Sequence, residues 1–258
     1  MSDGFKELVR QQYSRQAHLY ARSQSHARGD SLELMAQWAR DEETELVLDV
    51  ACGCGFSSFA LAPLAREVVA VDLTPAMLKE ASRLARERGI ANIRFLGADA
   101  ESLPFPEGRF HLVACRLSAH HFYSPLRFLS ESFRVLATMG SLLLIDTSVP
   151  EDPEVALWQN TTERLRDPSH RENLPPSRWK ELIEEAGFHL VGFSTQHRTN
   201  LRFGDWVRTS GCPPRLVSDL LERFEQAPAA VKQAFQIRRD GSQIVFSWPL
   251  AAFKACKA

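Results

Sequence analysis

The sequence lacks a cysteine framework, a long apolar run and an apolar N-terminal segment. Its five cysteines are odd in number and scattered among apolar neighbours, which favours free thiols in a reducing compartment over disulfides. No uncharged apolar run approaches the ~18 residues that a membrane span needs. The opening residues, MSDGFKELVRQQ, carry charges where a signal peptide needs an apolar core. We therefore expect a cytoplasmic protein without stable membrane insertion.

The sequence also lacks an excess of charge of either sign. Lys and Arg number 31, Asp and Glu number 32, and the formal net charge is −1. Without a basic excess we expect no nucleic-acid partner. Internal repeats, low-complexity tracts and linkers are absent, and 44% hydrophobic with 24% charged residues is typical of a globular protein. We expect residues 1–258 to form one domain.

Short, nearly all-apolar segments alternate with amphipathic segments in the first part of the chain. The predicted strands are 45–50, 67–72, 92–96, 110–115 and 141–146. The predicted helices are 4–20, 31–40, 56–65, 74–88 and 125–137, with a polar loop at 21–30. Strands this apolar, connected by helices, are typical of an α/β protein whose parallel sheet is covered on both faces.

The rhythm changes after residue 146. The segment 148–167 is rich in Pro and acids and then helical in pattern, and it starts what we expect to be a helical insertion. The remaining predicted elements are a helix at 176–186 ended by Gly187, a strand at 188–195, two or three short helices within 203–235, and a closing strand at 242–253.

The stretch LVLDVACGCG, residues 46–55, poses the main functional question. A structural zinc site needs about four ligands, and no second Cys/His pair at suitable spacing follows Cys52 and Cys54, so we expect no metal. A dinucleotide loop would have a third glycine where Ser58 stands, and Asp49 would repel a pyrophosphate. S-adenosylmethionine (SAM) fits better, because it carries a sulfonium and an ammonium and no phosphate.

Two further acids follow the next two predicted strands. Asp72 ends EVVAVD and is placed to accept the ribose hydroxyls, by the logic that puts an acid on the ribose of NAD. Asp99 and Ala100, in GADAESLPF, are placed to hold the adenine amino group. Because the carboxyl ends of parallel strands share one edge of a sheet, Asp49, Asp72 and Asp99 are expected to line one crevice.

The segments VLDVACGCG, VVAVDLTPAML, GADAESLPFPEGRFHLVACRLSAHHF and FRVLATMGSLLLID resemble, in order, the motifs of class I SAM-dependent methyltransferases. The branch most similar contains the ubiquinone/menaquinone C-methyltransferases, and the resemblance covers roughly residues 13–192. It implies a Rossmann-like, doubly wound, mostly parallel seven-stranded sheet with a helical cap. The implied parts are an N-terminal helical lid (1–40), a SAM-binding core (41–147), substrate-side insertions (148–187 and 199–240) and a closing strand (241–258).

The resemblance also implies roles for particular residues. Ala51 stands where many of these enzymes have glycine, and His111 where Asp is usual. The implied SAM-binding set comprises a methionine-side loop (Asp49, Ala51, Gly53, Gly55), a ribose site (Asp72, with Leu73 and Met77 packing nearby), an adenine site (Asp99, Ala100), Arg116 beside the ligand, and lid residues Tyr20, Ser23 and His26.

Methyl transfer is an in-line displacement that sometimes needs a general base, and a histidine suits that task. His120 and His121 follow the fourth predicted strand and are our candidates, with His170 a weaker one. We expect the acceptor, the small-molecule substrate, to be apolar or aromatic and to be methylated on carbon or oxygen. An NAD(P)-dependent oxidoreductase and a non-catalytic regulatory protein that binds SAM or its product remain alternatives, and a homodimer stays open.

Overall fold

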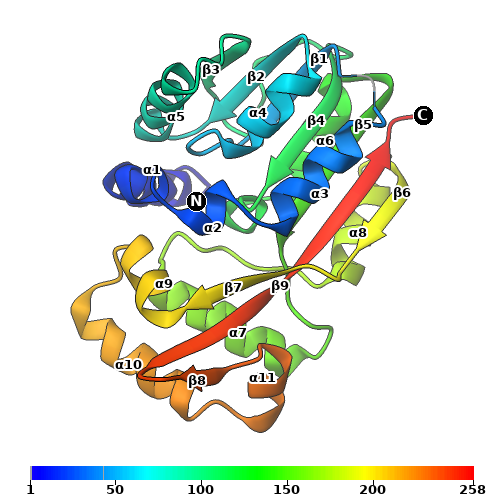
Figure 1. Ribbon diagram of the computed structural model, residues 1–258. Helices are drawn as coiled ribbons and strands as arrows, with labels where there is room; N and C mark the ends of the chain where they lie inside the picture. Colours follow the sequence, from blue (N-terminus) through cyan, green and yellow to red (C-terminus); the bar gives the residue numbers. More distant parts are fainter. Residues whose placement is uncertain (1, 43) are drawn as a thin grey trace.

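The computed structural model describes residues 2–42 and 44–258. Within these residues the centre of the protein is a nine-stranded sheet, whose strands are drawn as arrows in Figure 1. The strands are β1 (Leu46–Val50), β2 (Glu67–Asp72), β3 (Ile93–Gly97), β4 (Phe110–Arg116), β5 (Leu136–Thr147), β6 (His189–Ser194), β7 (Arg198–Arg202), β8 (Arg238–Asp240) and β9 (Gln243–Cys256).

Seven of these strands follow the order β3-β2-β1-β4-β5-β9-β6, and β7 and β8 pair with β9 off this path. The first five run parallel, whereas β9 is antiparallel to each of its neighbours. The strand order reverses between β1 and β4, and in open α/β sheets ligands bind at the carboxyl edge beside such a reversal. The predicted doubly wound α/β fold is confirmed, although the sheet has nine strands instead of the seven expected.

Helices cover both faces of the parallel part. They are α1 (Ser2–Tyr20), α2 (Gln24–Ala27), α3 (Asp30–Ala39), α4 (Phe56–Leu61), α5 (Pro75–Glu87), α6 (Pro125–Val135), α7 (Pro153–Arg166), α8 (Pro176–Glu185), α9 (Phe203–Thr209), α10 (Pro214–Glu225) and α11 (Ala229–Ala234). Phe128 of α6 and Trp179 of α8 belong to one apolar core with sheet residues, and Met35 of α3 belongs to another on different sheet residues. None of the helices in the described residues is both long and apolar enough to cross a membrane.

Proline and glycine set several element ends. Pro75 occupies the first turn of α5, as predicted, and Gly187 follows α8 at a φ of +95°, a conformation that side chains rarely adopt. The helix predicted over 56–65 stops at Leu61, because Pro63 has no N–H for the next helical hydrogen bond, and a 3₁₀ turn follows. Strand β5 begins at Leu136, earlier than the predicted start at residue 141, and Met139 within it takes a φ of +64°.

A further apolar core lies beyond the parallel sheet. The short helices predicted within 203–235 are present as α9, α10 and α11, and they pack with α7 around the first half of β9. This half of β9 pairs with β7 and β8, and its second half pairs with β5 and β6. One strand therefore joins the core and the insertion, as the red arrow of Figure 1 shows.

Helix α1 lies between these two parts (Figure 1). It packs against α5 of the core and against α9 of the insertion. The helix expected at 4–20 is thus confirmed, whereas the polar loop expected at 21–30 contains the short helix α2 and the start of α3.

Candidate active site

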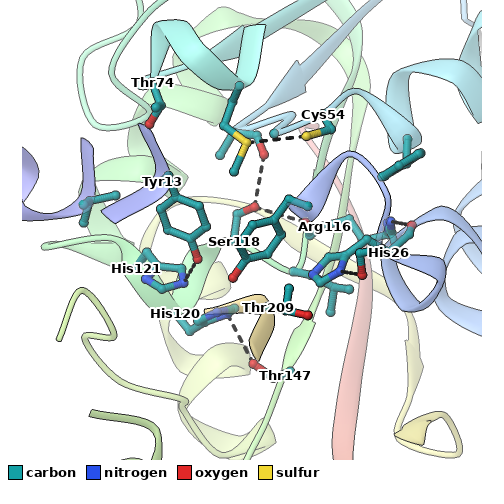
Figure 2. A pocket seen from close by; sticks show the side chains of 18 of the residues that line it. Tyr13, His26, Cys54, Thr74, Arg116, Ser118, His120, His121, Thr147 and Thr209 are labelled. Carbon is teal, nitrogen blue, oxygen red and sulfur yellow. Dashed lines mark hydrogen bonds between the residues drawn. The ribbon is translucent and has the colours of Figure 1, made fainter. Parts of the chain in front are cut away.

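A cavity of about 840 Å³ opens at the carboxyl edge of β1, β2, β3 and β4, under α1 and beside the insertion. Figure 2 shows part of its lining. All the candidate residues except Asp49 and Gly55 line this cavity. They are Tyr20, Ser23, His26, Ala51, Gly53, Asp72, Leu73, Met77, Asp99, Ala100, Arg116, His120 and His121, and the weaker candidate His170 lines it too.

The loop after β1 turns sharply toward the end of β2. Ala51 and Gly53 take positive φ angles of 55° and 53°, and the Gly53 N–H donates to Asp72 Oδ2 at 2.8 Å. A Cβ on Gly53 would enter open space, so its backbone is bare toward the cavity. Gly55 serves the loop differently, because a Cβ there would lie 2.9 Å from the Phe59 ring. Gly55 therefore packs closely against α4 and is not among the residues that line the cavity.

Asp49 lies behind this loop and is fully buried. Its Oδ2 accepts a hydrogen bond from the Ser58 hydroxyl at 2.5 Å, and its Oδ1 has no hydrogen-bond partner among the described residues. Burial raises the pKa of Asp49 to about 7, against the lowering effects of the Ser58 hydrogen bond and the Arg116 charge. This carboxyl is therefore poised to ionise when positive charge arrives nearby.

Arg116, at the end of β4, ties the cavity wall to the N-terminal segment. Its Nε donates to Ser57 Oγ at 3.1 Å, its Nη1 to Ser31 Oγ at 2.9 Å, and its Nη2 to the His26 carbonyl at 2.6 Å. Burial lowers the pKa of Arg116 to about 10, so it stays cationic at neutral pH. Burial and the Arg116 charge also lower the pKa of His26 to about 3, which keeps that ring neutral.

Asp72, which ends β2, and Asp99, which follows β3, are held by backbone N–H groups. Asp72 Oδ1 accepts from the Thr74 N–H at 2.8 Å, and Asp99 Oδ1 accepts from the Glu101 N–H at 2.9 Å. Lys6 of α1 reaches Asp99 Oδ2 at 2.7 Å and Glu101 Oε2 at 3.1 Å. Each acid therefore has a fixed orientation, and α1 closes over this end of the cavity.

His120 forms a dyad with Asp146 of β5. Its Nδ1 lies 2.7 Å from Asp146 Oδ1, while its backbone N–H donates to Asp146 Oδ2 at 2.7 Å. Burial alone would lower the pKa of His120, but the Asp146 charge and hydrogen bond outweigh it and raise the pKa. A carboxylate only accepts hydrogen bonds, so Nδ1 carries the proton. Nε2 has no hydrogen-bond partner in 2–42 or 44–258, and the ring lines the cavity.

His121 differs from His120 in that both of its ring nitrogens have hydrogen-bond partners and its pKa is lowered. Its Nδ1 lies 2.8 Å from the Ser169 carbonyl oxygen, and its Nε2 lies 2.5 Å from the Tyr13 hydroxyl, as Figure 2 shows for the latter pair. Burial and then the neighbouring His120 charge lower the pKa of His121 to about 4. Both ring nitrogens of His121 are thus committed to the protein, which leaves His120 as the better-placed base.

Two tryptophans form an aromatic wall at the insertion side of the cavity. Glu163 of α7 accepts from the indole N–H of Trp206 at 3.3 Å and of Trp248 at 2.5 Å, and its other oxygen pairs with Arg166 at 2.7 Å. The Arg166 guanidinium lies 4.8 Å from the centre of the Trp206 ring. One buried carboxylate therefore orients both indoles and the cation.

Comparison with known proteins shows which family the chain belongs to. Residues 48–144 match the family model described as "Methyltransferase domain". The chain is 32% identical to the uncharacterised methyltransferase YcgJ of Bacillus subtilis over 238 residues, 91% of this chain and 93% of that one. The crystal structure of YcgJ superposes with a TM-score of 0.80 at 31% identity, over 88% of this chain and 97% of that one. The chain belongs to the SAM-dependent methyltransferase family.

Other methyltransferases are also similar to this chain in structure or in sequence. A candidate methyltransferase from Bacillus halodurans C-125 superposes with a TM-score of 0.83 at 35% identity, over 89% of this chain and 99% of that one. The demethylmenaquinone methyltransferase of Thermus thermophilus is 38% identical over 114 residues, 43% of this chain and 51% of that one. SAM is accordingly the cofactor, and the oxidoreductase alternative is set aside.

The sequence did not single out four side chains of this methyltransferase site: Tyr13, Asp146, Glu163 and Arg166. Tyr13 falls within the predicted helix 4–20 and Asp146 ends the predicted strand 141–146, but neither was given a role. Cys54 and Cys115 are buried in the core, and burial raises the pKa of both thiols, that of Cys54 to about 12. Neither thiol is suited to act as a nucleophile.

Proposed function

We propose that this methyltransferase acts on a small, apolar or aromatic acceptor, and that His120 is its general base. The observation that carries the proposal is the continuity of one cavity. The bare loop and the acids Asp72 and Asp99 lie at one end, and His120 with the aromatic wall of Trp206 and Trp248 lies at the other. Bound SAM would supply a methyl group made electrophilic by its sulfonium.

The residues present fit that cofactor part by part. Both carboxylate oxygens of Asp72 keep lone pairs after accepting their backbone hydrogen bonds, so ribose hydroxyls have acceptors there. The cationic Arg116 suits the carboxylate of the methionine moiety. The unpartnered Oδ1 of Asp49 provides negative charge beneath the loop that would face the ammonium and sulfonium.

The acceptor end supports an aromatic substrate. Trp206 and Trp248 are among the residues that line the cavity, and pockets for small molecules are largely apolar with few polar groups that fix orientation. His120 Nε2 would accept the proton of an acceptor hydroxyl as the methyl group is transferred. The relatives named for demethylmenaquinone, and a tocopherol O-methyltransferase of Arabidopsis thaliana that is 33% identical over 120 residues, support this class of acceptor.

Binding of S-adenosylhomocysteine, the product form of the cofactor, tests the cofactor end. We expect calorimetric titration of the wild type to show binding, no heat with NAD, and affinity about 10- to 100-fold weaker in Asp72→Ala, because charge-assisted hydrogen bonds to the ribose are lost. Asp219→Ala, at an exposed site on α10, is the matched control and should bind as the wild type does. Equal affinity in Asp72→Ala would remove the ribose assignment.

Affinity for S-adenosylhomocysteine is expected to rise with pH through about 7. The free carboxyl of Asp49 has its pKa raised to about 7, and the ammonium of the bound ligand favours its ionised form. Binding below that pH therefore expels a proton and should weaken by up to about tenfold per pH unit. Titrations of the wild type and Asp49→Asn across this range check the prediction. The same slope in Asp49→Asn would assign the linkage to another group, such as His120.

Turnover separates the enzyme from a protein that only binds SAM. With methyl-labelled SAM and a panel of phenols, hydroquinones and their thiol and amine analogues, we expect label transfer to a hydroxylated aromatic compound. Intact S-adenosylhomocysteine binding with no transfer to any hydroxylated aromatic would count against the proposed acceptor class and favour the binding role.

A further inference from the structure

Tyr13 is a residue of α1 that lines the cavity. It lies against two other lining residues, because its ring centre is 5.2 Å from that of Tyr20 and 5.1 Å from that of His121. Figure 2 shows its hydroxyl directed toward the His121 ring. Among the described residues, Tyr13 is the tyrosine whose ring packs against His121, so it brings the lid helix directly to the acceptor end.

The direction of the hydrogen bond between Tyr13 and His121 follows from the partners. The Ser169 carbonyl can only accept, so His121 Nδ1 carries a proton. The pKa of His121, lowered to about 4, makes the ring neutral near pH 7, and a neutral imidazole has one N–H. Nε2 is therefore an acceptor, and the Tyr13 O–H donates to it at 2.5 Å.

The direction of this hydrogen bond determines whether the Tyr13 hydroxyl can donate to a ligand or accept from it. Its only hydroxyl proton is committed to His121, so the phenolic oxygen can only accept hydrogen bonds. The Tyr20 hydroxyl is one hydrogen-bond partner of this oxygen, and its second lone pair is left for a ligand. Burial raises the pKa of Tyr13 well above its ordinary value, and the group stays un-ionised. A ligand that binds this oxygen must be a hydrogen-bond donor, and an ether or a ketone at the same place could not form that bond.

We propose that Tyr13 binds a hydroxyl group of the methyl acceptor, and that His121 works through Tyr13 as a positioning residue while His120 alone serves as the base. The inference rests on the proposed function and deepens it. The acceptor then meets two hydrogen-bond acceptors, His120 Nε2 and the Tyr13 oxygen, and a compound that can donate to both binds better than one that cannot. Because Tyr13 sits on α1, the acceptor site is complete only when the lid is docked.

A pair of probes that differ only in O–H against O–CH₃ tests this proposal. Hydroquinone and 1,4-dimethoxybenzene are titrated into the complex with S-adenosylhomocysteine, for the wild type and for Tyr13→Phe. We expect the wild type to favour hydroquinone, and the Tyr13→Phe change to shrink that preference by about 3- to 10-fold, the worth of one hydrogen bond. Tyr123→Phe is the matched control, because the Tyr123 side chain lies outside the cavity lining.

Enzyme kinetics provide a second test, because a purely structural role of Tyr13 would not change KM for the acceptor while leaving the pH dependence of kcat intact. Tyr13→Phe should raise KM for the acceptor and leave the pH dependence of kcat in place, because that dependence belongs to His120. An unchanged preference between the two probes, or failure of hydroquinone to bind the wild-type complex, would overturn the proposal. Both results are distinguishable from failure of the proposed function, since binding of S-adenosylhomocysteine is measured first in every variant.

Discussion

Replacing His120 by asparagine is expected to lower kcat for methyl transfer to a hydroxylated acceptor by about 10²- to 10⁴-fold, the usual worth of a positioned general base. The Asn side-chain amide can still donate to Asp146, so the surrounding loop keeps its main hydrogen bond. What is lost is Nε2, the nitrogen that would take the proton. Affinity for S-adenosylhomocysteine should change little, because the cofactor end does not depend on this nitrogen.

The dependence of kcat on pH provides a second test of His120 as the base. The Asp146 carboxylate raises the pKa of His120 above its ordinary value, and a base acts only when unprotonated. Activity of the wild type should therefore be low at acid pH and rise through a pKa above about 6.5. His189→Asn, at an exposed position on β6, is the control and should keep both rate and profile. Full activity in His120→Asn would exclude the base assignment.

The cofactor end was predictable because its signals are local. The loop residues Ala51 and Gly53 and the acids Asp72 and Asp99 lie at or just after strand ends, and parallel strands bring their carboxyl ends to one edge without any further folding information. Asp72 and Asp99 needed only the alternation of apolar and amphipathic segments to be placed. The exception is Asp49, which shares the same edge but lies behind the loop, because a strand-end side chain can point to either face of the pleat.

The acceptor end was predictable only in outline, because it is assembled from distant segments. Tyr13 and His121 are 108 residues apart, and Glu163 and Trp248 are 85 apart. Strand β7 was missed since its sequence, RTNLR, carries one apolar residue and little sign of a buried strand. The extended β9 was foreseen as a strand, but nothing in its own sequence shows that it pairs with four different strands.

The buried carboxylate of Glu163 is expected to be the largest single contributor to stability at the cavity wall. Glu163→Ala should lower the free energy of unfolding by about 3–5 kcal/mol, because it leaves a largely buried cation without its partner. The two indole N–H groups of Trp206 and Trp248 lose an acceptor at the same time. Urea denaturation measures the change, and Glu184→Ala on the exposed face of α8 is the control, expected to stay within about 0.5 kcal/mol of the wild type.

A double-mutant cycle with Arg166 separates the causes. If the unpaired guanidinium is the main penalty, Arg166→Ala in the Glu163→Ala background should recover part of the lost stability, and the two changes should not add. If the indoles are the main penalty, the two losses should add. Affinity for S-adenosylhomocysteine should be kept in the folded single variants, whereas affinity for an aromatic acceptor should fall, because the wall that Glu163 orients belongs to the acceptor end. A Glu163→Ala protein as stable as Glu184→Ala would show that this carboxylate does not hold the wall together.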